Sequence, residues 1–265
     1  MNPSVTLPYL ASSITWRSPL RWLALGWADL KRNPVPGLIH GFVLTGFASL
    51  LLWLAGDQFW FLAGAFSGFL IVAPIVATGL YHVSRACNSG RCVGMPEVIA
   101  LWRSGDGRLV RFGLLLGLAG TGWVMASAAL ITLWSPIPIN KPMDFLRHVV
   151  LARELGLFEA WVMFGALLAA PIFASSVITI PMLVDTRASL PEAVVESWRT
   201  VANHPVPMGL WALLITALTL LGMLTALLGL IVLIPLLAHS SWHAYCDVAR
   251  RPAGLPPEWR PANDH

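Results

Sequence analysis

Long hydrophobic runs separated by short charged segments form the main pattern of the chain. Crossing a hydrocarbon core of about 30 Å takes roughly 20 helical residues. Four runs with almost no charged residues reach this length, at about Val35–Ala55, Phe59–Ser84, Val110–Trp134 and Phe158–Leu183. We expect each of them to form a transmembrane helix.

The last hydrophobic run, Val206–Cys246, contains no charged residue when histidine is neutral. As one helix it would be about 60 Å long, twice the thickness of the hydrocarbon core. Two spans at about 206–222 and 225–246, joined by a tight turn near Gly222–Thr225, fit the membrane better. The sequence therefore predicts six spans.

An internal repeat organises these spans. Trp27 precedes Pro34-Val35-Pro36 by seven residues, as Trp198 precedes Pro205-Val206-Pro207. Trp102 and Trp198 each precede a Gly-Leu pair by eleven residues, and each tryptophan ends an amphipathic stretch that suits the membrane interface. At the exit ends, Ala77 and Ala238 occupy the same offset before Tyr81-His82 and Trp242-His243. The predicted unit, used three times, is one interfacial helix followed by a two-span hairpin.

The predicted fold class is therefore all-α, a polytopic membrane bundle of six transmembrane helices built from three such repeats. Residues 1–34 are expected to form a cytoplasmic segment with an amphipathic interfacial helix, and residues 35–248 the membrane domain. Residues 249–265 are expected to form a flexible cytoplasmic tail. The stretch Pro142–Leu155 either caps the bundle or lies on the outer membrane surface, and its hydrophobic spacing favours the surface-lying helix.

Composition supports membrane insertion and charge sets the orientation. Hydrophobic residues make up 57% of the chain and charged residues 11%, whereas soluble domains have about 25% charged residues. Of the 17 Lys and Arg residues, only Lys141, Arg147 and Arg153 fall on the predicted outer side. The positive-inside rule then places both termini in the cytoplasm. The net charge of +4 is too small and too scattered to indicate nucleic-acid binding.

Several strings of the chain resemble a known family. These strings, at Pro19–Leu23, Gly26–Leu30, Ala77–Arg85 and Pro235–Tyr245, are similar to the DUF2189 family of predicted bacterial integral membrane proteins. The similarity extends over roughly Pro19 to Arg251. It implies a bacterial inner-membrane location and a six-span plan, but no particular chemistry.

A candidate metal site comes from residues near the inner end of the last span. His239 and His243 are four residues apart and so share a helical face. With Cys246 one turn further and His82 at the equivalent repeat position, four ligands for a transition metal could converge. The alternative is a polar belt in which these histidines bind headgroups and backbone atoms. No other cofactor is indicated.

Three glycine pairs at the spacing G-x3-G suit close helix packing, namely Gly37 with Gly41, Gly64 with Gly68 and Gly113 with Gly117. The chain contains no Walker sequence, no G-x-S-x-G, no H-E-x-x-H and no pair of mid-membrane carboxylates, so we expect no enzymatic activity.

Two functions remain open. The first is a non-enzymatic binding, scaffold or assembly protein, with membrane lipids and a membrane-protein partner or a second copy as partners. The second is a transporter or channel for a small neutral or metal solute. A polar cavity that reaches mid-membrane would favour the transporter, and a bundle closed by apolar contacts would favour the first function.

Overall fold

The computed structural model describes residues 14–103, 105–135, 137–152 and 156–249, without the side chains of residues 55, 59, 60, 63 and 66–75. Within this part of the chain all regular secondary structure is helical, which confirms the predicted all-α class. Four helical segments are long and apolar enough to cross a membrane among the residues described. They are Pro34–Leu54, Gly107–Trp134, Leu157–Asp185 and Pro205–Leu224.

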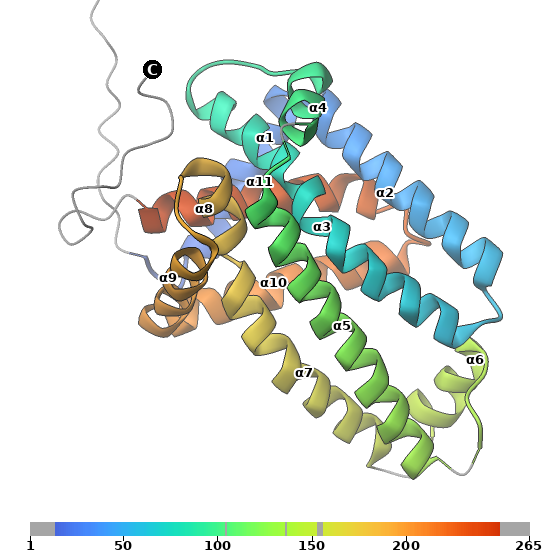
Figure 1. The fold of residues 1–265 in the computed structure, drawn as a ribbon. Coiled ribbons are helices and arrows are strands. Elements are labelled where there is room, and N and C mark those ends of the chain that lie inside the picture. Colours follow the sequence, from blue (N-terminus) through green and yellow to red (C-terminus); the bar gives the residue numbers. More distant parts are fainter. Residues whose placement is uncertain (1–13, 104, 136, 153–155, 250–265) are drawn as a thin grey trace, which may run out of the picture.

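The helices follow the predicted alternation of short amphipathic and long apolar elements (Figure 1). In chain order they are α1 (Ser18–Arg32), α2 (Pro34–Ala55), α3 (Phe59–Asn88), α4 (Met95–Arg103), α5 (Gly107–Trp134), α6 (Pro142–Phe145), the π-helical turn η1 (Leu146–Val150), α7 (Leu157–Ser176), α8 (Thr179–Asp185), α9 (Leu190–Asn203), α10 (Pro205–Leu224) and α11 (Leu230–Ala249).

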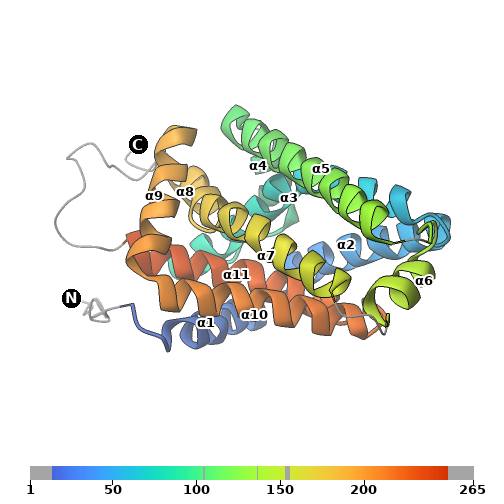
Figure 2. The same cartoon turned by 90° about the horizontal axis from the view of Figure 1, so that it is seen from below.

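The junctions before α2 and α10 share one backbone conformation. Asn33 ends α1 with φ −137° and ψ 72°, and His204 ends α9 with φ −131° and ψ 55°. Proline follows each of these residues, and because proline has no N–H and fixes φ, it disfavours a continuous helix before it and suits the first position of the next helix. Figure 2 shows α1 and α9 near the end of the molecule where both described termini lie.

The predicted fourth span, 158–183, is divided into α7 and α8 at Val177 and Ile178. Pro181 causes the division, because its ring lacks the N–H that would bond the Val177 carbonyl and crowds that carbonyl. The Ile178 N–H instead donates to Ser197 Oγ on α9, at 3.1 Å. The break therefore anchors α9 against the end of the span.

The turn between the last two long helices lies later than predicted, at Thr225–Gly229 instead of Gly222–Thr225. Ala226 and Leu227 adopt positive φ values of 52° and 68°, and the Thr225 hydroxyl accepts from the Gly229 N–H. Gly222 lies inside α10, where an added Cβ would lie 2.6 Å from Leu230 Cδ2. Gly222 thus permits close helix packing and does not form the turn.

The sequence favours a surface-lying helix at Pro142–Leu155. Residues 153–155 lie outside the described residues, and the described part of this stretch does not form one continuous helix. α6 and η1 form a compact element, and Val149 of η1 is buried against Ile131 of α5, Ile139 and Leu157 of α7. Val149 therefore packs on the ends of α5 and α7, whereas Leu146 of the same turn remains exposed.

The largest buried core lies where α1, α8, α10 and α11 meet. Trp22, Trp211 and Trp242 are almost fully buried there, and the rings of Trp22 and Trp211 meet edge to face at 5.7 Å. Tyr245 Oη donates to Asp185 Oδ2 at 2.8 Å, and Arg85 pairs with the same carboxylate. This core holds α1, α3, α8 and α11 together at one end of the bundle.

Candidate functional site

Close packing of α1 on α11 forms one wall of a buried polar cluster. A Cβ added at Gly26 of α1 would lie 2.7 Å from the Ser240 backbone nitrogen, so only glycine allows this approach. One turn further along α1, Asp29 reaches α11, where its Oδ2 lies 2.8 Å from His243 Nε2. Both side chains are buried, so each compensates the polarity of the other.

The other wall comes from α2 and α3. His239 of α11 is fully buried, and its Nδ1 lies 2.7 Å from Ser84 Oγ of α3. His40 of α2 is buried between α3 and α4, where its ring meets Trp102 edge to face at 5.3 Å. We refer to Asp29, His40, Ser84, His239 and His243 as the histidine cluster.

Two nitrogens of the histidine cluster are unsatisfied. His40 Nδ1 bonds the Pro36 carbonyl at 2.6 Å, but His40 Nε2 has no hydrogen-bond partner among the described residues. The same holds for His239 Nε2 within that part of the chain. Trp102 Nε1, on the ring that meets His40, is a further buried nitrogen without a partner in the described structure.

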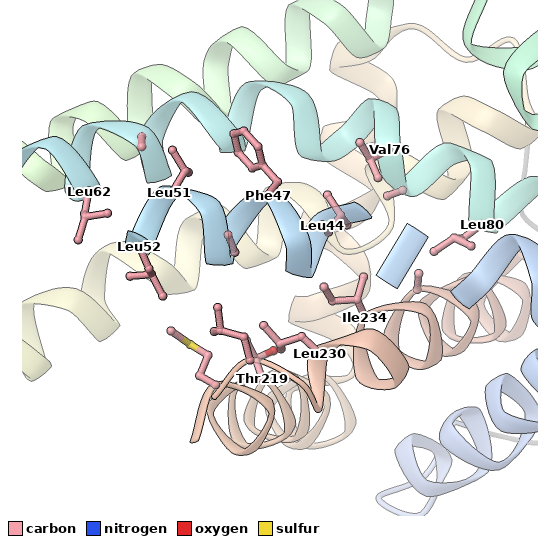
Figure 3. Close-up of a pocket in the computed structure, with 16 residues that line it drawn as sticks. Leu44, Phe47, Leu51, Leu52, Leu62, Val76, Leu80, Thr219, Leu230 and Ile234 are labelled. Carbon is pink, nitrogen blue, oxygen red and sulfur yellow. The ribbon is translucent and has the colours of Figure 1, made fainter. Parts of the chain in front are cut away.

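A cavity of about 530 Å³ lies between the helix pair α2–α3 and the helix pair α10–α11. Figure 3 shows side chains of the two pairs facing a shared space. It is lined by Leu44, Phe47, Ala48, Leu51, Leu52, Leu62, Ala65, Val76, Ala77, Leu80, Thr219, Met223, Leu227, Leu230, Ile234 and Ala238. Among the described lining residues, Thr219 carries the one polar side chain, so this part of the wall is almost entirely hydrocarbon.

The cavity and the histidine cluster adjoin. Leu44 and His40 are one helical turn apart on α2 and share a face, as do Leu80 and Ser84 on α3. On α11, Ala238 lines the cavity and His239 follows it directly. The site is therefore an apolar cavity with a polar cluster next to one end.

The four predicted metal ligands have separate surroundings. His239 bonds Ser84 and His243 bonds Asp29, whereas Cys246 Sγ lies 3.9 Å from Asn88 Nδ2. His82 is half-buried on α3. Among the described residues, no group of three or more His, Cys, Asp or Glu side chains is arranged to hold a metal ion. The transition-metal site stays a prediction without geometric support.

Sequence reasoning missed two residues of this site. Asp29 is 214 residues from His243 in the chain, and Ser84 is 155 residues from His239. No local sequence pattern predicts contacts between residues so far apart in the chain. The repeat did contain one signal for the cavity, because Ala77 and Ala238 share the same repeat offset and both line it.

Comparison with known proteins identifies a family over part of the chain. The DUF2189 family model, described as a predicted integral membrane protein, matches residues 61–185, from α3 to α8. This match confirms the resemblance to DUF2189 over that range, which is shorter than the range expected from the sequence strings. No curated protein and no solved structure matches the chain.

Proposed function

We propose that this integral membrane protein is a non-enzymatic binding protein that holds the hydrocarbon chain of a lipid in the cavity between α2–α3 and α10–α11. The observation that carries this proposal is the hydrocarbon wall of a cavity of about 530 Å³. Ligand cavities of small molecules have volumes of about 300–1,000 Å³, so this one is large enough for a specific ligand.

The shape of the lining suits a long chain. Leu62 and Leu80 line the cavity from α3 and are eighteen residues apart, which is about 27 Å along a helix. That length approaches the thickness of the hydrocarbon core, about 30 Å. A lipid chain can therefore lie along the cavity, and the surrounding membrane supplies such chains.

The physics of the bilayer favours a filled cavity. An apolar cavity gains little from water, because its wall offers water almost no hydrogen-bond partners. An empty one leaves the side chains of its wall without dispersion contacts. A hydrocarbon chain supplies those contacts without leaving a polar group unsatisfied.

The alternative is a transporter or channel for a small neutral or metal solute, and the same wall argues against it where the solute is a metal ion or another hydrated species. Such a path needs groups that replace the hydration of the solute, and Thr219 provides the one hydroxyl group among the described lining residues. The apolar lining thus favours binding over conduction of such a solute.

We also propose the six-span, three-repeat plan, with both termini in the cytoplasm of a bacterial inner membrane. α3 and α11, the two predicted spans beyond the four apolar ones, have 30 and 20 residues and are long enough to cross. Tyr81 and Trp242, at equivalent repeat positions, stack with ring centroids 6.3 Å apart. This pairing is what a repeat packed on its own copy would give.

The proposed binding can be tested by filling the cavity. Ala48→Phe places a ring in the cavity, whereas Ala169→Phe adds the same ring to an exposed position of α7. We expect purified wild-type protein and Ala169→Phe to retain a co-purifying lipid by native mass spectrometry and lipid extraction. Ala48→Phe should retain at least fivefold less.

The elution profile and the thermal midpoint in detergent show whether both variants are folded. Ala65→Phe is a second variant that fills the cavity. Equal lipid retention in the wild type and the folded cavity variants would contradict the proposal.

A further inference from the structure

We infer that the exposed face of α1 is a binding surface for the headgroups of anionic phospholipids, on the side of the membrane where α1 lies. The inference goes beyond the lipid cavity and does not depend on it, because the cavity lies between other helices. It rests on a helix face that is exposed, apolar in its middle and cationic at both ends.

This face of α1 carries apolar side chains that do not pack on the protein. Its members follow one another at steps of three and four residues, so they share one side of the helix, and all of them are exposed. They are Arg17, Leu20, Ala24, Trp27 and Lys31, and we call this set the α1 stripe. The side chain of Leu20 is 58% exposed and that of Trp27 is 44% exposed, so the middle of the stripe needs an apolar environment.

The opposite face of α1 fixes this orientation. It is buried in the bundle and includes Trp22, Gly26 and Asp29. Gly26 allows the close approach to the Ser240 backbone, and Asp29 contacts His243. The helix therefore cannot turn the α1 stripe inward without exposing Trp22 and breaking the contact of Asp29. The stripe faces the surroundings of the protein.

The two ends of the α1 stripe are cationic. Arg17 Cζ lies 4.8 Å from the centre of the Trp16 ring, and Lys31 Nζ lies 6.0 Å from the centre of the Trp27 ring. These cation–π contacts hold both charges next to apolar ring surface. The described structure pairs neither cation with a carboxylate, since Asp29, the one carboxylate of α1, is buried on the opposite face.

An anionic membrane surface complements both features of the α1 stripe. The apolar side chains of an interfacial helix enter the boundary between headgroups and acyl chains, while lysine and arginine reach out to the phosphates. Each such cation raises the affinity for an anionic surface about fivefold. A zwitterionic lipid accepts the apolar side chains equally well but brings no net charge to the cations. The stripe therefore selects anionic lipid.

α9 provides a comparison within the same chain, and it lies near the same end of the molecule in Figure 2. Trp198 and Ala202 are exposed one turn apart on α9, so this helix also presents an apolar face to its surroundings. Its one cation, Arg199, lies 3.9 Å from Glu196, and Glu192 adds a second exposed carboxylate. α9 thus suits the membrane interface but has no excess of cations, so we expect it to show no preference for anionic lipid.

Photocrosslinking at one position on each helix tests the inference. Ala24→benzoylphenylalanine places the photoreactive group in the middle of the α1 stripe, and Ala202→benzoylphenylalanine places it on α9. The full chain is embedded in nanodiscs of equal parts phosphatidylglycerol and phosphatidylcholine with the same acyl chains, and mass spectrometry counts the lipid adducts. At Ala24 we expect phosphatidylglycerol adducts to exceed phosphatidylcholine adducts at least about fivefold, and at Ala202 we expect a ratio near one.

Charge variants locate the effect. Arg17→Gln combined with Lys31→Gln removes both cations at exposed positions and should lower the ratio at Ala24 to that at Ala202. Arg199→Gln is the matched control and should leave the ratio at Ala24 unchanged. A measurement without any charge variant is the salt dependence. The ratio at Ala24 should fall between about 0.1 M and 1 M salt, because the Debye length shrinks from about 10 Å to about 3 Å.

Three outcomes decide the inference. A ratio near one at Ala24, or a higher ratio that the folded double variant and high salt leave unchanged, would overturn it. Adducts to protein instead of lipid at Ala24 would also overturn it, because a second copy or another protein would then cover the α1 stripe. Ala48→Phe fills the cavity and should not change the ratio, so a preference for phosphatidylglycerol at Ala24 stands even if the proposed lipid cavity fails its own test.

Discussion

At the residue scale, Arg108 connects the start of α5 to the end of α8, although the two helices are far apart in the chain. It follows the N-cap Asp106 of α5 and pairs with that carboxylate at 2.6 Å. Its guanidinium also donates to the carbonyl oxygens of Leu183, Thr186 and Ala188 around the end of α8. One planar group thus satisfies carbonyls that the helix end leaves without partners.

Arg108→Lys should lower the free energy of unfolding by about 2 kcal/mol, because a lysine ammonium cannot reach the carboxylate and three carbonyls together. Arg111→Lys is the matched control, since the exposed Arg111 bonds only the Gly107 carbonyl of its own helix in the described structure. Thermal or denaturant unfolding in detergent measures both. Equal losses in the two variants would mean that Arg108 contributes no more than a surface arginine.

The ion pair between Arg108 and Asp106 makes this loss of stability depend on pH. Burial raises the pKa of the Asp106 carboxyl, but hydrogen bonds and charge from Arg108 outweigh burial, so the pKa lies below its ordinary value of 3.8. The stabilisation is then complete above the unfolded-state pKa and is lost as the pH falls through the lower folded-state pKa. The difference between wild type and Arg108→Lys should therefore be constant near neutral pH and shrink below about pH 4.

At the element scale, glycine decides how closely helices approach. A Cβ at Gly41 of α2 would clash with the Ile231 carbonyl oxygen of α11, and one at Gly37 would lie 3.1 Å from Pro235 Cβ. The pair Gly37 and Gly41 thus forms a packing surface, as its spacing predicted. Gly64 does not, because no described atom lies within 4 Å of a Cβ added there.

Gly41→Ala should lower the free energy of unfolding by about 1–3 kcal/mol, the usual cost of overpacking, because backbone has to move. Gly46→Ala lies on the same helix with open space around it and should be neutral or slightly stabilising, since alanine favours helix. Midpoints of thermal unfolding in one detergent compare the two. A neutral Gly41→Ala would contradict the close approach of α2 and α11.

At the scale of the whole molecule, the charge distribution and the helix ends are consistent with one orientation. The segment that bears Lys141 lies with the α2–α3 turn, where Lys141 pairs with Asp57 at 3.5 Å, and α6 lies beside that turn in Figure 1. The start of α1, the end of α11 and α9 lie at the opposite end in Figure 2. An even number of crossings would leave both termini on one side.

Reporter fusions test this orientation. A periplasm-active reporter fused after His265 should give no signal, because the positive-inside rule predicts a cytoplasmic C-terminus. The same reporter inserted after Lys141 should be active and shows that the fusion protein reaches the membrane. Strong activity at the C-terminus would require an odd number of spans or the reverse orientation.

The sequence by itself determined the membrane environment, the helical class and most helix bounds, because apolar length and proline position act locally. It could also place His239 and His243 on one helical face, since that follows from the helical repeat. Which atoms those histidines meet was decided by the tertiary structure, which turns them toward Ser84 of α3 and Asp29 of α1.

The cavity likewise depends on how two helix pairs rotate and how far apart they pack. A hydrophobic run looks the same whether its side chains face lipid, a neighbouring helix or a cavity. Membrane insertion and helix formation are therefore readable from the chain, whereas the binding site arises only where α2, α3, α10 and α11 come together.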